Sequence, residues 1–212
     1  MLLQNVYTLE GKLIKIKKIR DNMFLIKVMT TGLTKDKMNF PQVIVKGELA
    51  HNFEELYKAG DYVSIKAHIG ERSTNVNGKI KPVNAIYADS IEQIKTLAAE
   101  FGFEGNLSDE KVARFKNELN VSGIVEFVTP MSNGKKRVVG LLTPQKVVVT
   151  DFYSKRDYTN IQKGSLVCVK ALCQTRNKAI KNEEDNTEYM KHIDTFNVKQ
   201  IIPVESNGVL RR

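Results

Sequence analysis

The sequence predicts a mainly β protein of two tandem five-stranded barrels joined by a helical linker, and three observations support this fold class. First, Tyr57 to Arg72 reads as a helix end, a glycine turn and a strand, and Ile161 to Arg176 repeats this pattern 104 positions later. Second, apolar and polar residues alternate with a period of two in both halves, as expected for half-buried strands. Third, hairpin turn signals stand at Asn77-Gly78 and Asn133-Gly134.

In the first half, the elements are expected in the order strand, strand, strand, helix, strand, strand. The expected strands are Gly11 to Arg20, Met23 to Met29, Phe40 to Val45, Tyr62 to Ile69 and Lys79 to Ala88. A helix is expected within Glu48 to Lys58, closed by Gly60. Phe24 and Phe53 share faces with aliphatic residues, so both are expected in the core. Five strands with a helix between the third and the fourth form the order of an OB-fold barrel.

The second half repeats this plan, so the chain is divided into an OB-fold domain at 1–96, a helical linker at 97–119 and a second OB-fold domain at 120–212 with a short basic tail. The expected strands of the second domain are Val121 to Val128, Arg137 to Leu142, Lys146 to Thr150, Leu166 to Leu172 and a segment around Tyr189 to Ile202. Ser108 is a suitable N-cap for a helix in the linker. The repeat also predicts that the two domains fold independently.

Charge favours an anionic partner for both domains. The formal net charge is +9, of which residues 1–96 carry +5, residues 97–119 carry −2 and residues 120–212 carry +6. Two basic units on a joint that is not basic favour an anionic partner such as nucleic acid or a membrane surface. No apolar stretch approaches the ~20 residues that span a bilayer, so no membrane partner is expected. The start of the chain does not read as a signal peptide.

Cysteine usage fits a reducing cytoplasm. Cys168 and Cys173 lie five positions apart on one expected strand, which places them on opposite faces. We therefore expect no disulfide between them and a cytoplasmic location.

The first domain resembles the bacterial single-stranded DNA-binding protein family. The likeness rests on Val43 to Ala50, VIVKGELA, and on Tyr57 to Gly60 with the strand and arginine at Val63 to Arg72. It implies a protein that binds single-stranded DNA without sequence preference and protects it in replication, recombination or repair. Two OB-folds in one chain occur in that family, and phages and mobile elements carry divergent forms, so a phage or mobile-element origin and the host cytoplasm are expected.

A protein that binds single strands without sequence preference needs a basic groove for the backbone and aromatic faces for the bases. The resemblance places Phe40 at a stacking tryptophan of the family, and Lys46 where a second aromatic often stands. The candidates in the first domain are Phe40, Lys15, Lys17, Lys27, Lys46, Tyr62, Lys66, Arg72, Lys79, Lys81 and Tyr87. The candidates in the second domain are Lys135, Lys136, Arg137, Lys146, Phe152, Tyr153, Tyr158, Lys170, Arg176, Lys178, Lys181 and Lys191.

The two domains are expected to stack bases differently. Pro41 fixes the backbone at the strand entry and holds the Phe40 ring on the barrel face. The position 104 residues after Phe40 is Pro144, so the second domain is expected to use Tyr153, Tyr158 or charge alone.

Sequence motifs do not favour an enzyme. No phosphate-binding loop is present, the three histidines are scattered and no Cys-x-x-Cys pair exists, so neither a metal nor a cofactor is expected. Two alternatives to a single-stranded DNA-binding protein remain open, an RNA-binding OB module and a protein–protein adaptor in a replication or virion assembly. The chain is compatible with a homo-oligomer. It ends without the acidic tail with which the family recruits replication proteins, so no such recruitment is expected.

Overall fold

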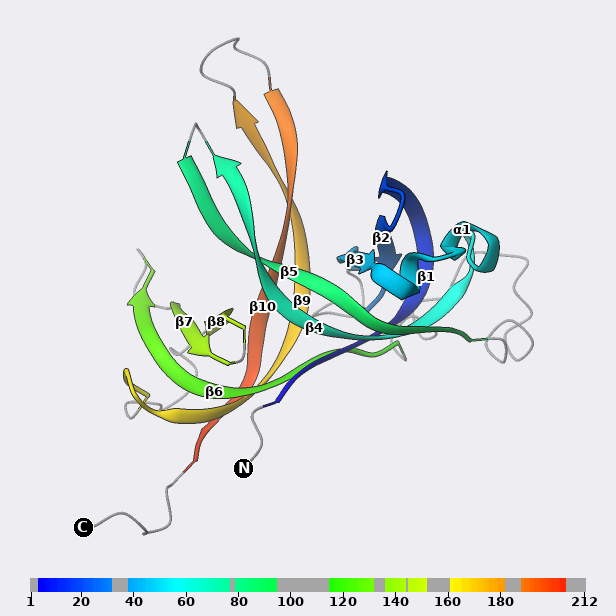
Figure 1. The fold of residues 1–212 in the computed structure, drawn as a ribbon. Coiled ribbons are helices and arrows are strands. Elements are labelled where there is room, and N and C mark those ends of the chain that lie inside the picture. Colours follow the sequence, from blue (N-terminus) through cyan, green and yellow to red (C-terminus); the bar gives the residue numbers. More distant parts are fainter. Residues whose placement is uncertain are drawn as a thin grey trace.

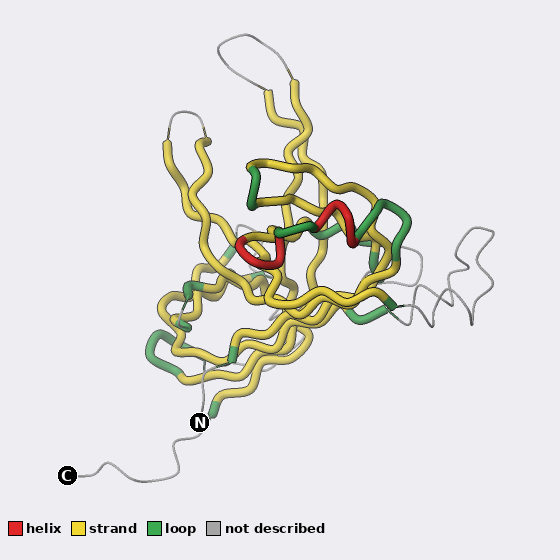
Figure 2. Tube along the Cα trace, turned by 45° about the vertical axis from the view of Figure 1, so that its right-hand side comes forward, coloured by secondary structure: helices red, strands yellow, loops and turns green. Residues whose placement is uncertain are grey.

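The computed structural model describes residues 4–31, 38–76, 79–94, 115–131, 136–143, 145–151, 161–181 and 188–204. Strands dominate this part of the chain, and the helical turns are confined to one short segment (Figure 2). The mainly β fold class is therefore confirmed.

The first barrel closes as predicted for an OB-fold. Its strands are β1 (Asn5–Arg20), β2 (Met23–Met29), β3 (Gln42–Lys46), β4 (Tyr62–Val76) and β5 (Lys79–Gln93). They neighbour one another in the order β1-β2-β3-β5-β4, and β4 returns to β1. The pairing of β3 with β5 is parallel and the other pairings are antiparallel.

The second barrel has the same topology. Its strands are β6 (Asn117–Pro130), β7 (Arg137–Leu142), β8 (Val147–Asp151), β9 (Leu166–Lys181) and β10 (Glu188–Pro203). They follow the order β6-β7-β8-β10-β9, and β9 returns to β6. As in the first barrel, the pairing of the third with the fifth strand, β8 with β10, is parallel, and the other pairings among the described residues are antiparallel.

The expected helix between the third and fourth strands is two short pieces. A 3-10 turn, Gly47–Ala50, precedes the one-turn helix α1, Phe53–Leu56. Asn52 has the left-handed backbone angle φ 55°, which interrupts a continuous helix over 48–58. Phe53 and Phe24 are buried with ring centroids 5.2 Å apart, so their assignment to the core is confirmed.

The strand registers show that every strand of the first barrel has a counterpart in the second. The number of positions along the chain between corresponding residues is not constant. It is 112 from β1 to β6, 113 from β2 to β7, 106 from β3 to β8, 104 from β4 to β9 and 110 from β5 to β10. The β-bulges recur as well. The register of β4 with β5 shifts between Lys66 and Ala67, and the register of β9 with β10 shifts between the corresponding residues Lys170 and Ala171. The uniform offset of 104 is thus right only for β4 and β9, because the connections between strands differ in length.

The correction matters most for the third strand. Val43 corresponds to Val149 rather than to Val147, and the counterpart of Phe40 is Lys146 rather than Pro144. At this position the first barrel therefore has an aromatic ring and the second barrel has a lysine.

The two barrels share one sheet through the pairing of β1 with β6. Tyr7 lies opposite its own counterpart Leu119, and Asn5 and Leu9 pair with Val121 and Asn117. A pseudo-two-fold axis therefore passes through the Tyr7–Leu119 pair. One hydrophobic cluster continues across both barrels, with the rings of Tyr7 and Phe196 in edge contact at 5.6 Å.

The start of β6 corrects the end of the predicted helical linker. Residues 117–119 are strand, with Asn117 and Leu119 buried and Glu118 between them exposed. That alternation follows from pairing with β1 and is incompatible with a helix. The predicted domain boundary at 119/120 lies inside β6, and linker residues 97–114, Ser108 among them, lie outside the described residues.

The two cysteines are free, as predicted. Cys173 is buried and Cys168 is half-buried on β9. Burial raises the pKa of the Cys173 thiol well above its ordinary value, and the charge of Asp194 raises it further.

Candidate nucleic-acid interface

A pocket of about 350 Å³, here called the central pocket, lies between the two barrels. Most of the residues that line it come in pairs that occupy corresponding positions of the two repeats. The pairs are Leu25 with Val138, Gln42 with Val148, Ile44 with Thr150, Arg72 with Arg176, Val83 with Ile193, Asn84 with Asp194, Ala85 with Thr195, and Ile86 with Phe196. The pocket therefore lies on the pseudo-two-fold axis.

Strand alternation aims these side chains at the pocket. Phe24, Ile26 and Val28 point into the first barrel, so Leu25 and Lys27 point outward from β2. Their neighbours on β3, Ile44 and Gln42, point the same way. The outer face of strands two and three is the surface with which OB-folds bind oligonucleotides.

Each barrel sends a long hairpin across to the other barrel. The β4–β5 and β9–β10 hairpins project on the same side of the molecule (Figure 1). The Asn84 side chain donates to the carbonyl oxygen of Val148 at 2.6 Å and accepts from the Val148 amide at 3.2 Å. In the reverse direction, Asp194 Oδ2 accepts from the Gln42 amide at 3.2 Å. The corresponding residues Asn84 and Asp194 thus fix each hairpin to the third strand of the opposite barrel.

A second cross-barrel contact holds the entry of β3. The Phe40 amide donates to Thr175 Oγ1 at 2.9 Å, and the Thr175 amide donates to Asn39 Oδ1 at 3.1 Å. The Phe40 backbone is therefore tied to the opposite hairpin, while its ring remains half-buried.

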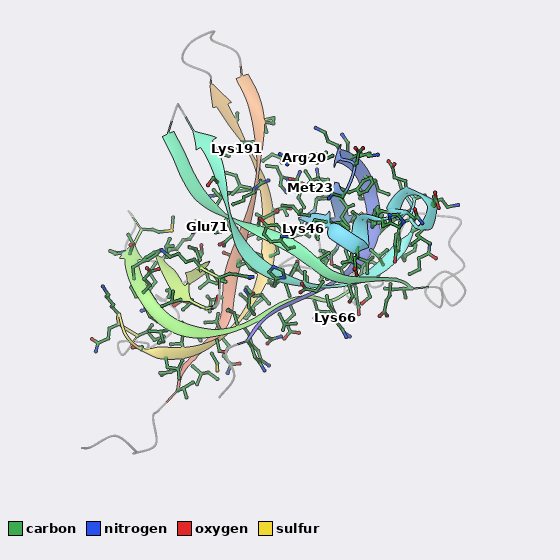
Figure 3. The ribbon with its side chains drawn as sticks, viewed as in Figure 1. Arg20, Met23, Lys46, Lys66, Glu71 and Lys191 are labelled. Atoms are coloured by element: carbon green, nitrogen blue, oxygen red, sulfur yellow. The ribbon has the colours of Figure 1, made fainter. Side chains whose placement is uncertain are left out.

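Cations gather around the central pocket. Arg72 and Arg176, both exposed, line it from the two hairpins, and Lys191 joins them on β10. One carboxylate, Asp194, is also present, with its Oδ1 2.9 Å from His192 Nε2. Arg20, Met23 and Lys46 lie together on the side of the first barrel that faces Lys191, whereas Lys66 lies on the opposite side (Figure 3).

Phe40 and Tyr87 of the first barrel are each accompanied by a lysine. Lys27 Nζ lies 5.7 Å from the centroid of the Phe40 ring, and Lys46 Nζ lies 4.4 Å from that of Tyr87. Tyr87 also packs against His68, with ring centroids 5.5 Å apart, and lies across Gly70. A Cβ at Gly70 would stand 2.8 Å from the ring, so the glycine is required for this position.

In the second barrel the structure exposes Phe127, which the sequence pattern does not indicate as a binding residue. Its side chain is 38% exposed and lies across Gly140, beside a hollow of about 250 Å³ that Glu71 and Lys146 also line. Simple alternation places Phe127 in the core with Val125. The register shift between these two residues turns the ring outward, and the sequence carries no clear signal for that shift.

Two predicted site residues, Tyr62 and Arg137, are buried and do not line the central pocket. Tyr62 packs against Phe115 with ring centroids 6.0 Å apart. Arg137 forms a buried ion pair with Asp151, with Nη2 and Oδ2 2.9 Å apart. The pair occupies the places of Phe24 and Val45 in the first barrel, so a charge pair replaces two apolar residues.

The other predicted cations are spread over the surface. Lys15 and Lys17 are exposed on β1, and Lys136 is half-buried. Lys66 and Lys170 correspond to each other and are exposed beside the β1–β6 seam, where they pair with Thr8 and Asn120. Neither lysine lines the central pocket.

Some candidates cannot be placed. Lys135, Phe152, Tyr153 and Tyr158 lie outside the described residues, and for Lys79, Lys81, Lys178 and Lys181 only the backbone is described. In the part of the chain that the structure describes, no group of three or more histidine, cysteine or acidic side chains could hold a metal ion, and no helix is long and apolar enough to cross a membrane.

Comparison with solved structures identifies a protein with the same fold. The wild-type single-stranded DNA binding protein from Thermus aquaticus matches with a TM-score of 0.64 at 12% identity, covering 100% of this chain and 98% of that one. A deletion mutant of the T. aquaticus protein gives a TM-score of 0.62 at 11% identity, covering 100% and 99%. The sequence matches no protein-family model and no curated protein. The chain thus has, along its whole length, the fold of the T. aquaticus single-stranded DNA binding protein, as its resemblance to that family predicted.

Proposed function

We propose that the chain binds single-stranded DNA without sequence preference, along a groove that runs over the central pocket. The observation that carries the proposal is the pair of corresponding arginines, Arg72 and Arg176, which line the same pocket from opposite barrels. A polyanion that crosses the molecule there meets a guanidinium group on each side, and guanidinium groups suit phosphate geometry.

Three partly exposed rings, two of them beside lysines, support the same function. Phe40 with Lys27, Tyr87 with Lys46, and Phe127 offer faces on which bases can stack, and every base has such a face. The T. aquaticus protein with this fold is by its name a single-stranded DNA binding protein. We infer that the biological role is to coat and protect single strands in replication, recombination or repair.

Titration of the full chain with fluorescently labelled oligonucleotides tests the proposal. The probes are a (dT) oligonucleotide, an RNA of the same length, and a duplex, each titrated at several salt concentrations. The expected result is tighter binding to the DNA single strand than to either competitor. A plot of log affinity against log salt concentration should have a slope of roughly −0.7 for each phosphate neutralised.

Each other outcome has a defined meaning. Affinity that stays flat from low to moderate salt contradicts a charge-lined groove. Tighter binding to RNA identifies an RNA-binding module, and the absence of binding at low salt supports a protein–protein adaptor.

A further inference from the structure

We propose that the central pocket receives one unpaired base of the bound strand, while Arg72 and Arg176 hold the phosphates on either side of it. The inference rests on the proposed function, because the pocket lies within the same groove. It adds a subsite of a different kind from the open aromatic faces, since here a base is enclosed between the two barrels.

The shape and lining of the pocket suit an aromatic heterocycle. Its volume of about 350 Å³ is at the lower end of the ~300–1,000 Å³ of pockets that hold small ligands. Leu25 and Ile44 form the wall on the first barrel, and Val138 and Val148 form the wall on the second. Apolar walls on two sides favour a flat, weakly polar group over a sugar or a phosphate.

Polar groups that could meet the edge of a base are also present. The Gln42 carboxamide and the Thr150 hydroxyl line the pocket and have no hydrogen-bond partner among the described residues. Each can both donate and accept, so neither demands a particular base. The side chains of Asn84 and Asp194 are already engaged in fixing the hairpins.

The arginines explain why the occupant should be part of a polynucleotide rather than a free base. Arg72 and Arg176 come from opposite hairpins and are related by the pseudo-two-fold axis on which the pocket lies. A nucleotide within a strand has a phosphate on each side, which matches one arginine on each side. A base in a duplex would first have to be unpaired and unstacked, which costs free energy, so the pocket also favours single strands.

Filling the pocket tests the inference. Val148→Phe places a larger side chain in the pocket, and Val6→Phe is the matched control, because Val6 is exposed on the β1–β6 seam and does not line the pocket. Each variant and the unaltered protein are titrated with a (dT) oligonucleotide and with an abasic oligonucleotide of the same length and charge.

We expect Val148→Phe to weaken (dT) binding about tenfold, in line with the loss of one base contact, and to leave abasic binding within about twofold. Val6→Phe should change neither. Equal losses for both oligonucleotides, or no loss for either, would overturn the inference. If the unaltered protein binds neither oligonucleotide at low salt, the proposed function itself fails.

A second variant keeps the test decisive if Val148→Phe does not fold, as judged by circular dichroism. Gln42→Leu keeps the side-chain size and removes the carboxamide that faces the pocket. It should weaken (dT) binding severalfold and spare abasic binding, and unchanged (dT) binding by this folded variant would contradict the inference.

Discussion

At the scale of single residues, the second barrel contains a buried ion pair where the first barrel has two apolar side chains. Asp151 is fully buried and its Oδ1 has no partner among the described residues, so its charge depends on Arg137. We predict that Arg137→Ala lowers the free energy of unfolding by about 3–5 kcal/mol. The double variant Arg137→Phe with Asp151→Val copies the first barrel and should recover most of that loss. Urea unfolding measures both, and a double variant as unstable as the single one would contradict this account.

The aromatic rings allow a second prediction at this scale. Phe40 and Phe127 are partly exposed, and the counterparts of Phe40 and Phe127 in the opposite repeats are Lys146 and Lys15. Each barrel thus has one ring where the other has a lysine. Phe40→Ala and Phe127→Ala should each weaken single-strand binding by about 1–3 kcal/mol and leave the melting temperature nearly unchanged. A sharp fall in melting temperature with intact affinity would instead show that the ring is a core residue.

At the scale of strands, two asparagine side chains bind backbone groups of β4 and β9 at the points where β1 and β6 stop pairing with those strands and pair with each other. The Asn5 side chain donates to the Ile69 carbonyl at 2.7 Å and accepts from the Ile69 amide at 3.0 Å. Asn117 makes the same two bonds to Cys173, at 2.9 Å and 3.0 Å, and also accepts from the Tyr7 hydroxyl at 2.8 Å. Each side chain therefore replaces a backbone partner at the seam.

We expect the two sets of bonds to contribute differently to the free energy of unfolding, because Asn117 is buried whereas Asn5 is half-buried. Asn117→Ala leaves the buried Cys173 amide and carbonyl without their side-chain partner and removes the bond that the Tyr7 hydroxyl donates to Asn117, so it should cost about 1–3 kcal/mol or more in the free energy of unfolding. Asn5→Ala is the matched variant and should cost less, because water can reach the half-buried site. Equal losses in denaturant unfolding would show that burial does not set the difference.

The same seam predicts a loss of stability in alkali. Burial raises the pKa of Tyr7 well above its ordinary value of 10.0, and Cys173 and Asp194 raise it further. Burial likewise raises the pKa of Cys173 above 9.0. The unfolded chain therefore loses these protons at a lower pH than the folded chain. The contribution of the two groups to the free energy of unfolding is fully present below pH 9.0 and is lost as the pH rises through the raised values. The free energy of unfolding of Cys173→Ala should fall less steeply, and an unaltered slope would contradict the assignment.

At the scale of the whole molecule, the sequence predicted what is repeated locally and missed what depends on turns and bulges. The pattern from Tyr57 to Arg72 and its copy predicted both barrels, because strand alternation and a glycine turn are local signals. The offsets of the other strands could not be predicted, since they depend on connection lengths. The outward turn of Phe127 depends on a bulge, and the burial of Arg137 depends on its pairing with Asp151.

The sequence also did not predict that the two barrels join into one sheet. Nothing in the composition of β1 and β6 shows that these strands pair with each other, and the predicted independence of the domains stays a prediction. The central pocket could not be predicted either, because only the pseudo-two-fold arrangement of the barrels brings Arg72 and Arg176 to one site.

The central claim is that a single strand crosses the axis between these arginines, and the salt dependence of binding tests it most directly. The double variant Arg72→Ala with Arg176→Ala is compared with Lys66→Ala with Lys170→Ala, which removes the same charge from corresponding exposed positions away from the pocket. In titrations with a (dT) oligonucleotide, the arginine variant should lose affinity and its slope of log affinity against log salt should become shallower by roughly 1.4, or about 0.7 for each phosphate contact. The lysine variant should keep both values. Equal slopes for the two variants would contradict the claim.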